Sequence, residues 1–133
     1  MQDSEGFYWI ATQNGLNRFD GTSFRIYRHA PGDSTSLTNN GCTSVIEDLN
    51  GDIWIATYTG VSKFVKSTGK FQRIYLHHPE QGFEISNRVY SLALDREGNI
   101  WIAGFGVWKY DVLKDQLTSF NNGSDNPSSI AGS

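Results

Sequence analysis

Three copies of one short motif divide the chain into units of 45 to 47 residues. The copies read DSEGFYWIAT, DLNGDIWIAT and DREGNIWIAG, and they share an aspartate, a glycine and a tryptophan at fixed spacing. These residues are Asp3, Gly6 and Trp9, then Asp48, Gly51 and Trp54, then Asp95, Gly98 and Trp101. A period of this length indicates a repeat architecture, and it limits the possible folds more than any other feature.

Each unit contains short strand-like segments separated by Gly, Asn, Asp and Ser residues, which favour turns. The segment VYSLAL at 89–94 would point alternate side chains to the two faces of a sheet. Four strands within about 40–50 residues are typical of a β-propeller blade. No segment of ten or more residues has the period expected of an amphipathic helix. We therefore predict an all-β fold made of antiparallel propeller blades.

We place the blade units at about 1–41, 42–88 and 89–133 of a single domain that covers residues 1–133. The first unit lacks its own first strand, since only Met1 and Gln2 precede Asp3. About three four-stranded blades, with one strand missing, give about 11 strands. Propellers need about 4–8 blades to close, so we expect an open arc rather than a closed ring. Such a chain is expected to be a fragment or to assemble, with the remaining blades or a second copy as its partner.

The aspartate and glycine of each motif predict a hairpin turn. Asn50 and Gly51 would suit a two-residue turn with two positive φ angles, as type I′ requires. Glutamate replaces the asparagine in the other two units, so a turn with one positive φ is equally compatible. We expect the aspartate to accept backbone N–H groups across the turn, and Trp54 to pack between neighbouring blades.

Charge and composition exclude several other classes of protein. The net charge is −3 with a pI near 5.5, so no basic surface is predicted to bind nucleic acid. The single cysteine, Cys42, aligns with Val89 and is predicted to be a small core residue. Neither an apolar run of 18 residues nor a signal peptide is present in this sequence. We predict no metal and no cofactor, because the aspartates recur in every unit as turn residues.

Residues 48–64 read DLNGDIWIATYTGVSKF and resemble the two-component regulator propeller repeat, D-x-x-G-x-[IL]-W-[IV]-[GA]-T-x-x-G-[LV]-x-[RK]-[FY]. The stretch GDSTSLTNN at 32–40 is similar to that family's interblade loop. The resemblance implies the extracytoplasmic, periplasmic sensor region of a bacterial hybrid two-component system, many of which detect oligosaccharides released from glycans. No kinase or receiver motif is found in this sequence, so we expect it to be non-catalytic.

Ligand-binding residues are expected where a unit departs from the repeat, because structural residues recur in every unit. The candidate contacts are aromatic or histidine side chains in loops and turns, which can stack on sugars. They are Tyr58, His77, His78, Phe83, Phe105 and Trp108. Two alternatives stay open: a structural scaffold for protein interactions, and a propeller enzyme similar to streptogramin lyase. The enzyme needs a catalytic histidine and metal-linked carboxylates, which this sequence does not clearly supply.

Overall fold

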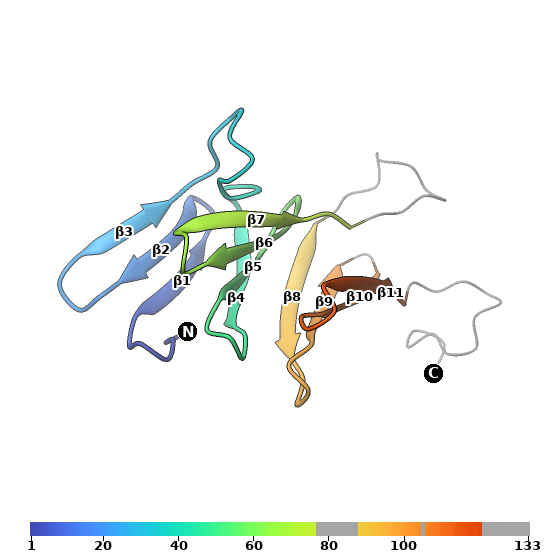
Figure 1. The fold of residues 1–133 in the computed structure, drawn as a ribbon. Coiled ribbons are helices and arrows are strands. Elements are labelled where there is room, and N and C mark those ends of the chain that lie inside the picture. Colours follow the sequence, from blue (N-terminus) through green and yellow to red (C-terminus); the bar gives the residue numbers. More distant parts are fainter. Residues whose placement is uncertain (77–87, 105, 121–133) are drawn as a thin grey trace.

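The computed structural model describes residues 1–76, 88–104 and 106–120, and their 11 strands form three antiparallel sheets that lie side by side (Figure 1). The first sheet contains β1 (Tyr8–Thr12), β2 (Gly15–Phe19) and β3 (Phe24–Tyr27). The second contains β4 (Cys42–Glu47), β5 (Ile53–Thr57), β6 (Gly60–Val65) and β7 (Lys70–Ile74). The third contains β8 (Val89–Leu94), β9 (Ile100–Gly104), β10 (Val107–Asp111) and β11 (Gln116–Ser119). The predicted open array of three blades is confirmed.

Within each sheet, strands that follow one another in sequence are hydrogen-bonded neighbours. Among the described residues, the first sheet has no counterpart of β4 and β8, and a single bridge between Gln2 and Tyr8 occupies that place. Both β4 and β8 shift register near their beginning, between Cys42 and Ser44 and between Val89 and Ser91. Such bulges increase the local twist of a strand. None of the described residues forms a helix long and apolar enough to cross a membrane.

The motif turn contains three residues, so the predicted two-residue turn is wrong. Asp48 N–H donates to the Asp52 carbonyl at 2.9 Å, and Gly51 N–H donates to the Asp48 carbonyl at 3.1 Å. Gly51 has a φ of 87°, whereas no asparagine among the described residues has a positive φ. The alternative with one positive φ is therefore observed, and the glycine supplies the left-handed conformation that this turn requires.

The tryptophan of each of the first two blades packs against an aromatic ring of the next blade. Trp54 and Tyr110 have ring centroids 5.0 Å apart, and Trp9 and Phe64 have centroids 5.3 Å apart. Two apolar clusters result, one between the first and second sheets and one between the second and third. Cys42 lies in the first cluster, where burial raises the pKa of its thiol to about 12. The predicted packing of Trp54 and the core position of Cys42 are confirmed.

The other face of the first blade is open to solvent. Phe24 is 62% exposed, and Tyr8, Ile10 and Ile26 are also exposed. The corresponding apolar residues of the second blade are buried against the first blade; they are Ile53, Ile55 and Phe71. The open face therefore has the composition of an interface between blades.

The loop between the first two blades is anchored from the second sheet. Leu37 is fully buried, and the Arg73 guanidinium of β7 donates to the carbonyls of Asp33 and Ser36. The Asn40 side chain accepts the backbone N–H of His29 at 2.7 Å. The segment that resembles an interblade loop thus joins consecutive blades.

Candidate functional site

The motif aspartates are engaged in structure rather than gathered into a catalytic group. Asp48 Oδ1 accepts the N–H groups of Asn50 and Asp52, and its Oδ2 accepts the Trp54 indole N–H at 2.8 Å. The same indole bond is 2.7 Å from Trp9 to Asp3 and 2.9 Å from Trp101 to Asp95. The turn role was predicted, whereas the indole bond was not. The signal for it was the constant spacing of six residues between aspartate and tryptophan.

Hydrogen bonds lower the pKa values of Asp3, Asp20 and Asp95. Burial by itself would raise the pKa of Asp3, but the indole bond from Trp9, the backbone bonds and Lys66 lower it overall. The indole bond from Trp101 lowers the pKa of Asp95. At the exposed turn of Asp20, backbone bonds from Ser23 and Thr22 lower the pKa to about 2.

We expect the chain to lose stability in acid. In the folded chain Asp3, Asp20 and Asp95 have pKa values below the ordinary 3.8, so the unfolded chain binds protons that the folded chain does not. Their stabilising contribution is complete above this value and disappears as the pH falls through the folded pKa values. Urea denaturation at pH 6, 4 and 3 measures the effect, and Asp20→Asn should reduce the slope. A free energy of unfolding that is constant over this range would contradict the expectation.

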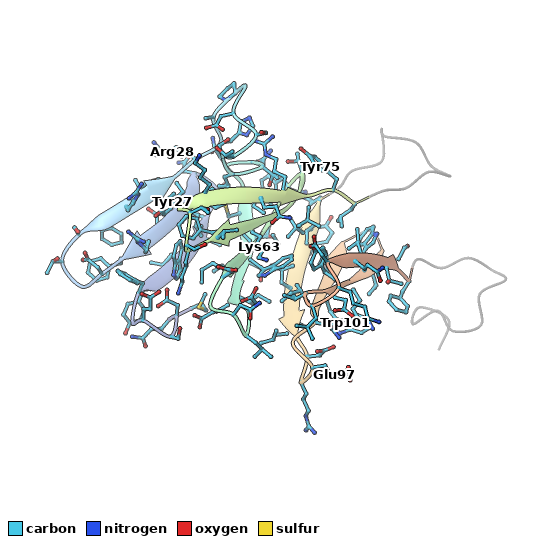
Figure 2. All side chains as sticks on the ribbon, viewed as in Figure 1. Tyr27, Arg28, Lys63, Tyr75, Glu97 and Trp101 are labelled. Atoms are coloured by element: carbon cyan, nitrogen blue, oxygen red, sulfur yellow. The ribbon has the colours of Figure 1, made fainter. Side chains whose placement is uncertain are left out.

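A cavity of about 220 Å³ opens between the first and second blades, and we call it the junction pocket. The first blade supplies most of its walls, from β1, β2, β3 and the segment just before β1, and the second blade closes it from β6 and the following turn. Figure 2 shows Tyr27 at this junction of the first two sheets. The lining residues are Glu5, Phe7, Trp9, Arg18, Arg25, Tyr27, Phe64, Lys66 and Gly69.

Aromatic rings form much of the pocket wall. Trp9 and Tyr27 are stacked with centroids 5.9 Å apart, and Phe64 lies 5.1 Å from Tyr27. Two guanidinium groups cover these rings. Arg18 lies 4.7 Å from the Phe7 ring centroid, and Arg25 lies 5.0 Å from that of Tyr27. The pocket therefore presents flat apolar surfaces next to positive charge.

Three carboxylates surround the lysine at one side of the pocket. Lys66 Nζ lies 3.0 Å from Glu5, 3.2 Å from Asp3 and 3.4 Å from Glu47. Burial by itself would lower the pKa of Lys66, but its bonds to Glu5 and Asp3 raise it overall. The lysine is therefore charged and fully engaged by protein carboxylates.

The predicted ligand contacts lie outside this pocket or outside the described residues. Tyr58 lies between β5 and β6, with the Arg88 guanidinium 4.1 Å from its ring centroid. Trp108 is only 2% exposed and belongs to the core between the second and third blades. The other four predicted contacts lie outside the described residues; they are His77, His78, Phe83 and Phe105. Ligand binding by these six residues stays a prediction, and the burial of Trp108 favours a packing role for it.

The junction pocket was not predicted from the sequence, although a signal for it was present. Most of its aromatic and cationic residues belong to the first repeat unit, whereas Phe64, Lys66 and Gly69 come from the second. Comparison of the units would have marked the positions where the first blade differs. They are Phe7 in place of Asp52 and Asn99, Arg25 in place of Gln72 and Thr118, and Tyr27 in place of Ile74 and Phe120.

Comparison with known proteins agrees with this architecture. Two extracellular domains from B. thetaiotaomicron match 97% of this chain: that of a hybrid two component system (31% identical, TM-score 0.78) and that of a one component system (28% identical, TM-score 0.65). The chain spans 19% and 17% of those two chains. Streptogramin B lyase shares the fold alone, at 18% identity and a TM-score of 0.65 over 91% of this chain and 39% of that one.

The fold and the repeats define the class of protein as a β-propeller segment. Residues 84–106 match the two component regulator propeller family. Histidine kinase P4 of Formosa agariphila is 54% identical over 37 residues, which are 28% of this chain and 3% of the kinase. The family match at residues 84–106, and the likeness to an extracellular domain of a hybrid two component system, confirm the resemblance to the two-component regulator propeller repeat that the sequence predicted.

Proposed function

We propose that the chain is part of the extracellular sensor region of a two-component system, where it binds glycan-derived oligosaccharides without catalysing a reaction. The observation that carries the proposal is the 31% identity and TM-score of 0.78 to an extracellular domain of such a system, over 97% of this chain. The same likeness supports a location outside the cytoplasm, and we place the chain in the periplasm of the parent cell as part of this proposal. Further blades are its expected partners, since the chain spans 19% of that relative.

The open face of the first blade supports a role within a larger array. Tyr8, Ile10 and Phe24 occupy positions whose counterparts in the second blade are buried by a neighbouring blade. Burial of such apolar area is the main favourable term in association. A further blade, from a longer polypeptide or from a second copy, would remove this surface from water.

The proposal is tested by thermal shift of the chain with a panel of oligosaccharides derived from complex glycans, together with chromatography of each mixture. We expect one class of oligosaccharide to raise the Tm and to be recovered unchanged. Recovery of cleaved or rearranged products would instead support a propeller enzyme. A protein partner in pull-downs, with no shift by any oligosaccharide, would support the scaffold alternative.

The coding DNA on either side of this segment provides a second test. We expect the reading frame to continue into further propeller repeats and a membrane helix followed by a kinase. A frame closed by stop codons on both sides would contradict the assignment to a sensor.

A further inference from the structure

A cation that covers the motif tryptophan is part of the repeat. The strand pairing places Arg18, Lys63 and Lys109 at one position of their blades. Each lies over the tryptophan ring of its own blade, at 5.7, 5.5 and 5.6 Å from the ring centroid. The cation therefore has a structural role that recurs in every blade. Only neighbouring groups that differ between the blades can indicate a ligand site.

The first blade lacks the carboxylate that the second blade gives to this cation. In the second blade, Lys63 Nζ lies 3.9 Å from Asp52. The first blade has Phe7 at the position of Asp52, and Arg18 lies over the Phe7 ring instead. Within the described residues, the Arg18 guanidinium contacts aromatic rings but forms neither a hydrogen bond nor an ion pair.

A second guanidinium stands beside the first. Arg25 of β3 is directly opposite Arg18 of β2 in the strand register. Like charges at such positions destabilise a sheet, and the Arg25 guanidinium likewise has no ion pair or hydrogen bond in the described part of the chain. An anion bound between the two groups would remove this repulsion and accept charge-assisted hydrogen bonds from both.

The protein carboxylates around the pocket do not pair with Arg18 or Arg25. Glu5, Asp3 and Glu47 all converge on Lys66 at one side. None of them forms an ion pair with Arg18 or Arg25. The three carboxylates repel a ligand anion from the part of the pocket next to Lys66, so the anion is expected to lie beside the two arginines.

The size and walls of the pocket limit the rest of the ligand. Its volume of about 220 Å³ is below the roughly 300–1,000 Å³ of sites for drug-sized molecules, so about one ring can enter. The Tyr27 ring is a flat surface on which a sugar ring can stack.

We propose that the junction pocket binds one acidic sugar unit, a ring that carries a carboxylate or a sulfate group, with its anion between Arg18 and Arg25. The choice of a sugar rests on the proposed function, whereas the choice of an anion rests on the contacts of the pocket. The occupant would thus be a charged unit of the oligosaccharide that the sensor binds.

The test is isothermal titration calorimetry of the chain with D-glucuronate and with D-glucose 6-sulfate, and with D-glucose and inorganic sulfate for comparison. We expect at least one of the two acidic sugars to bind, more tightly than glucose or free sulfate, and binding to weaken as salt is added. The ratio of the two acidic sugars shows whether carboxylate or sulfate is preferred.

A matched pair of variants isolates the charge. Phe7→Asp places the carboxylate of the second blade beside Arg18, and Phe7→Asn places there the neutral side chain of the third blade. Both variants lose the Phe7 ring, but only Phe7→Asp adds a carboxylate beside Arg18. Its affinity for the acidic sugar should therefore be lower than that of Phe7→Asn by a factor of about ten or more. Arg25→Gln should weaken binding similarly, whereas Arg96→Gln, at an exposed turn of the third blade, should not. Circular dichroism confirms that each variant is folded.

Three results would overturn the inference: no binding of either acidic sugar, equal binding of glucose, or equal affinities of the Phe7→Asp and Phe7→Asn variants. Binding of inorganic sulfate as tightly as the sugars would reduce the pocket to an adventitious anion site. If neutral oligosaccharides bind while acidic sugars do not, this inference fails and the sensor proposal stands. If no sugar of any charge binds, both fail.

Discussion

Replacement of Trp54 by alanine is expected to lower the free energy of unfolding by about 3–5 kcal/mol, the usual cost of deleting a large buried aromatic side chain. Trp54 is 0% exposed and packs 5.0 Å from Tyr110 of the next blade. The substitution also leaves the buried carboxylate of Asp48 without its indole donor. Urea denaturation followed by circular dichroism measures the loss.

The matched control is Trp101→Ala at the same position of the third blade. Trp101 is half-buried, and its ring contacts Phe120 of its own blade rather than a ring of a following blade. We therefore expect Trp101→Ala to lower the free energy of unfolding clearly less than Trp54→Ala does. Equal losses at the two positions would show that packing between blades is not the source of the stability.

Replacement of Asp48 by asparagine is expected to lower the free energy of unfolding by about 2–4 kcal/mol. Asparagine has the shape of aspartate but only one acceptor oxygen. If that oxygen faces the backbone N–H groups, the amide NH₂ meets the Trp54 indole N–H; if it faces the indole, the backbone N–H groups lose their acceptor. A buried donor left without an acceptor costs about 1–3 kcal/mol, and hydrogen bonds to charged groups are worth more than neutral ones. Denaturation in urea again provides the measurement, with the Trp54 indole proton resonance as a local probe.

Asp20→Asn serves as the control for this prediction. Asp20 also accepts two backbone N–H bonds, from Thr22 and Ser23, but it lies in an exposed turn without an indole donor. We expect a much smaller change there. A loss at Asp48 no larger than that at Asp20 would mean that the turn, and not the indole bond, accounts for the effect.

The blade interiors could be predicted from the sequence because their signals are local. The motif tryptophans Trp9 and Trp54 are buried, and the motif glycines mark turns that need a positive φ, as predicted. The alternation predicted for 89–94 is interrupted by the register shift of β8, so that Val89 and Leu92, three residues apart, are both buried. The choice of turn could not be made from Asn50-Gly51, since both candidate turns accept that pair. The three-residue turn is formed because Asp48 and Asp52, rather than their neighbours, close the hairpin.

The candidate site was harder to predict because it depends on contacts between units. Trp108 was expected to face a ligand, but it is paired with Ile102 and lies on the face that packs against the second blade. The junction pocket needs Arg18 and Phe7 from one unit and Lys66 from the next. No spacing within a single unit brings these side chains together.

The sequence by itself determined the number of blades, the order of their strands and the aspartate turns. Those features depend on hydrogen bonds and side-chain alternation within about 45 residues, and each unit carries its own copy of them. Only the tertiary structure decided which differences between the units matter. It places Arg18 and Arg25 of the first blade and Lys66 of the second around one cavity, because packing between blades joins residues that sequence separates. Within the first blade, Phe7 in place of the carboxylate of the second blade leaves the two arginines without an acidic neighbour.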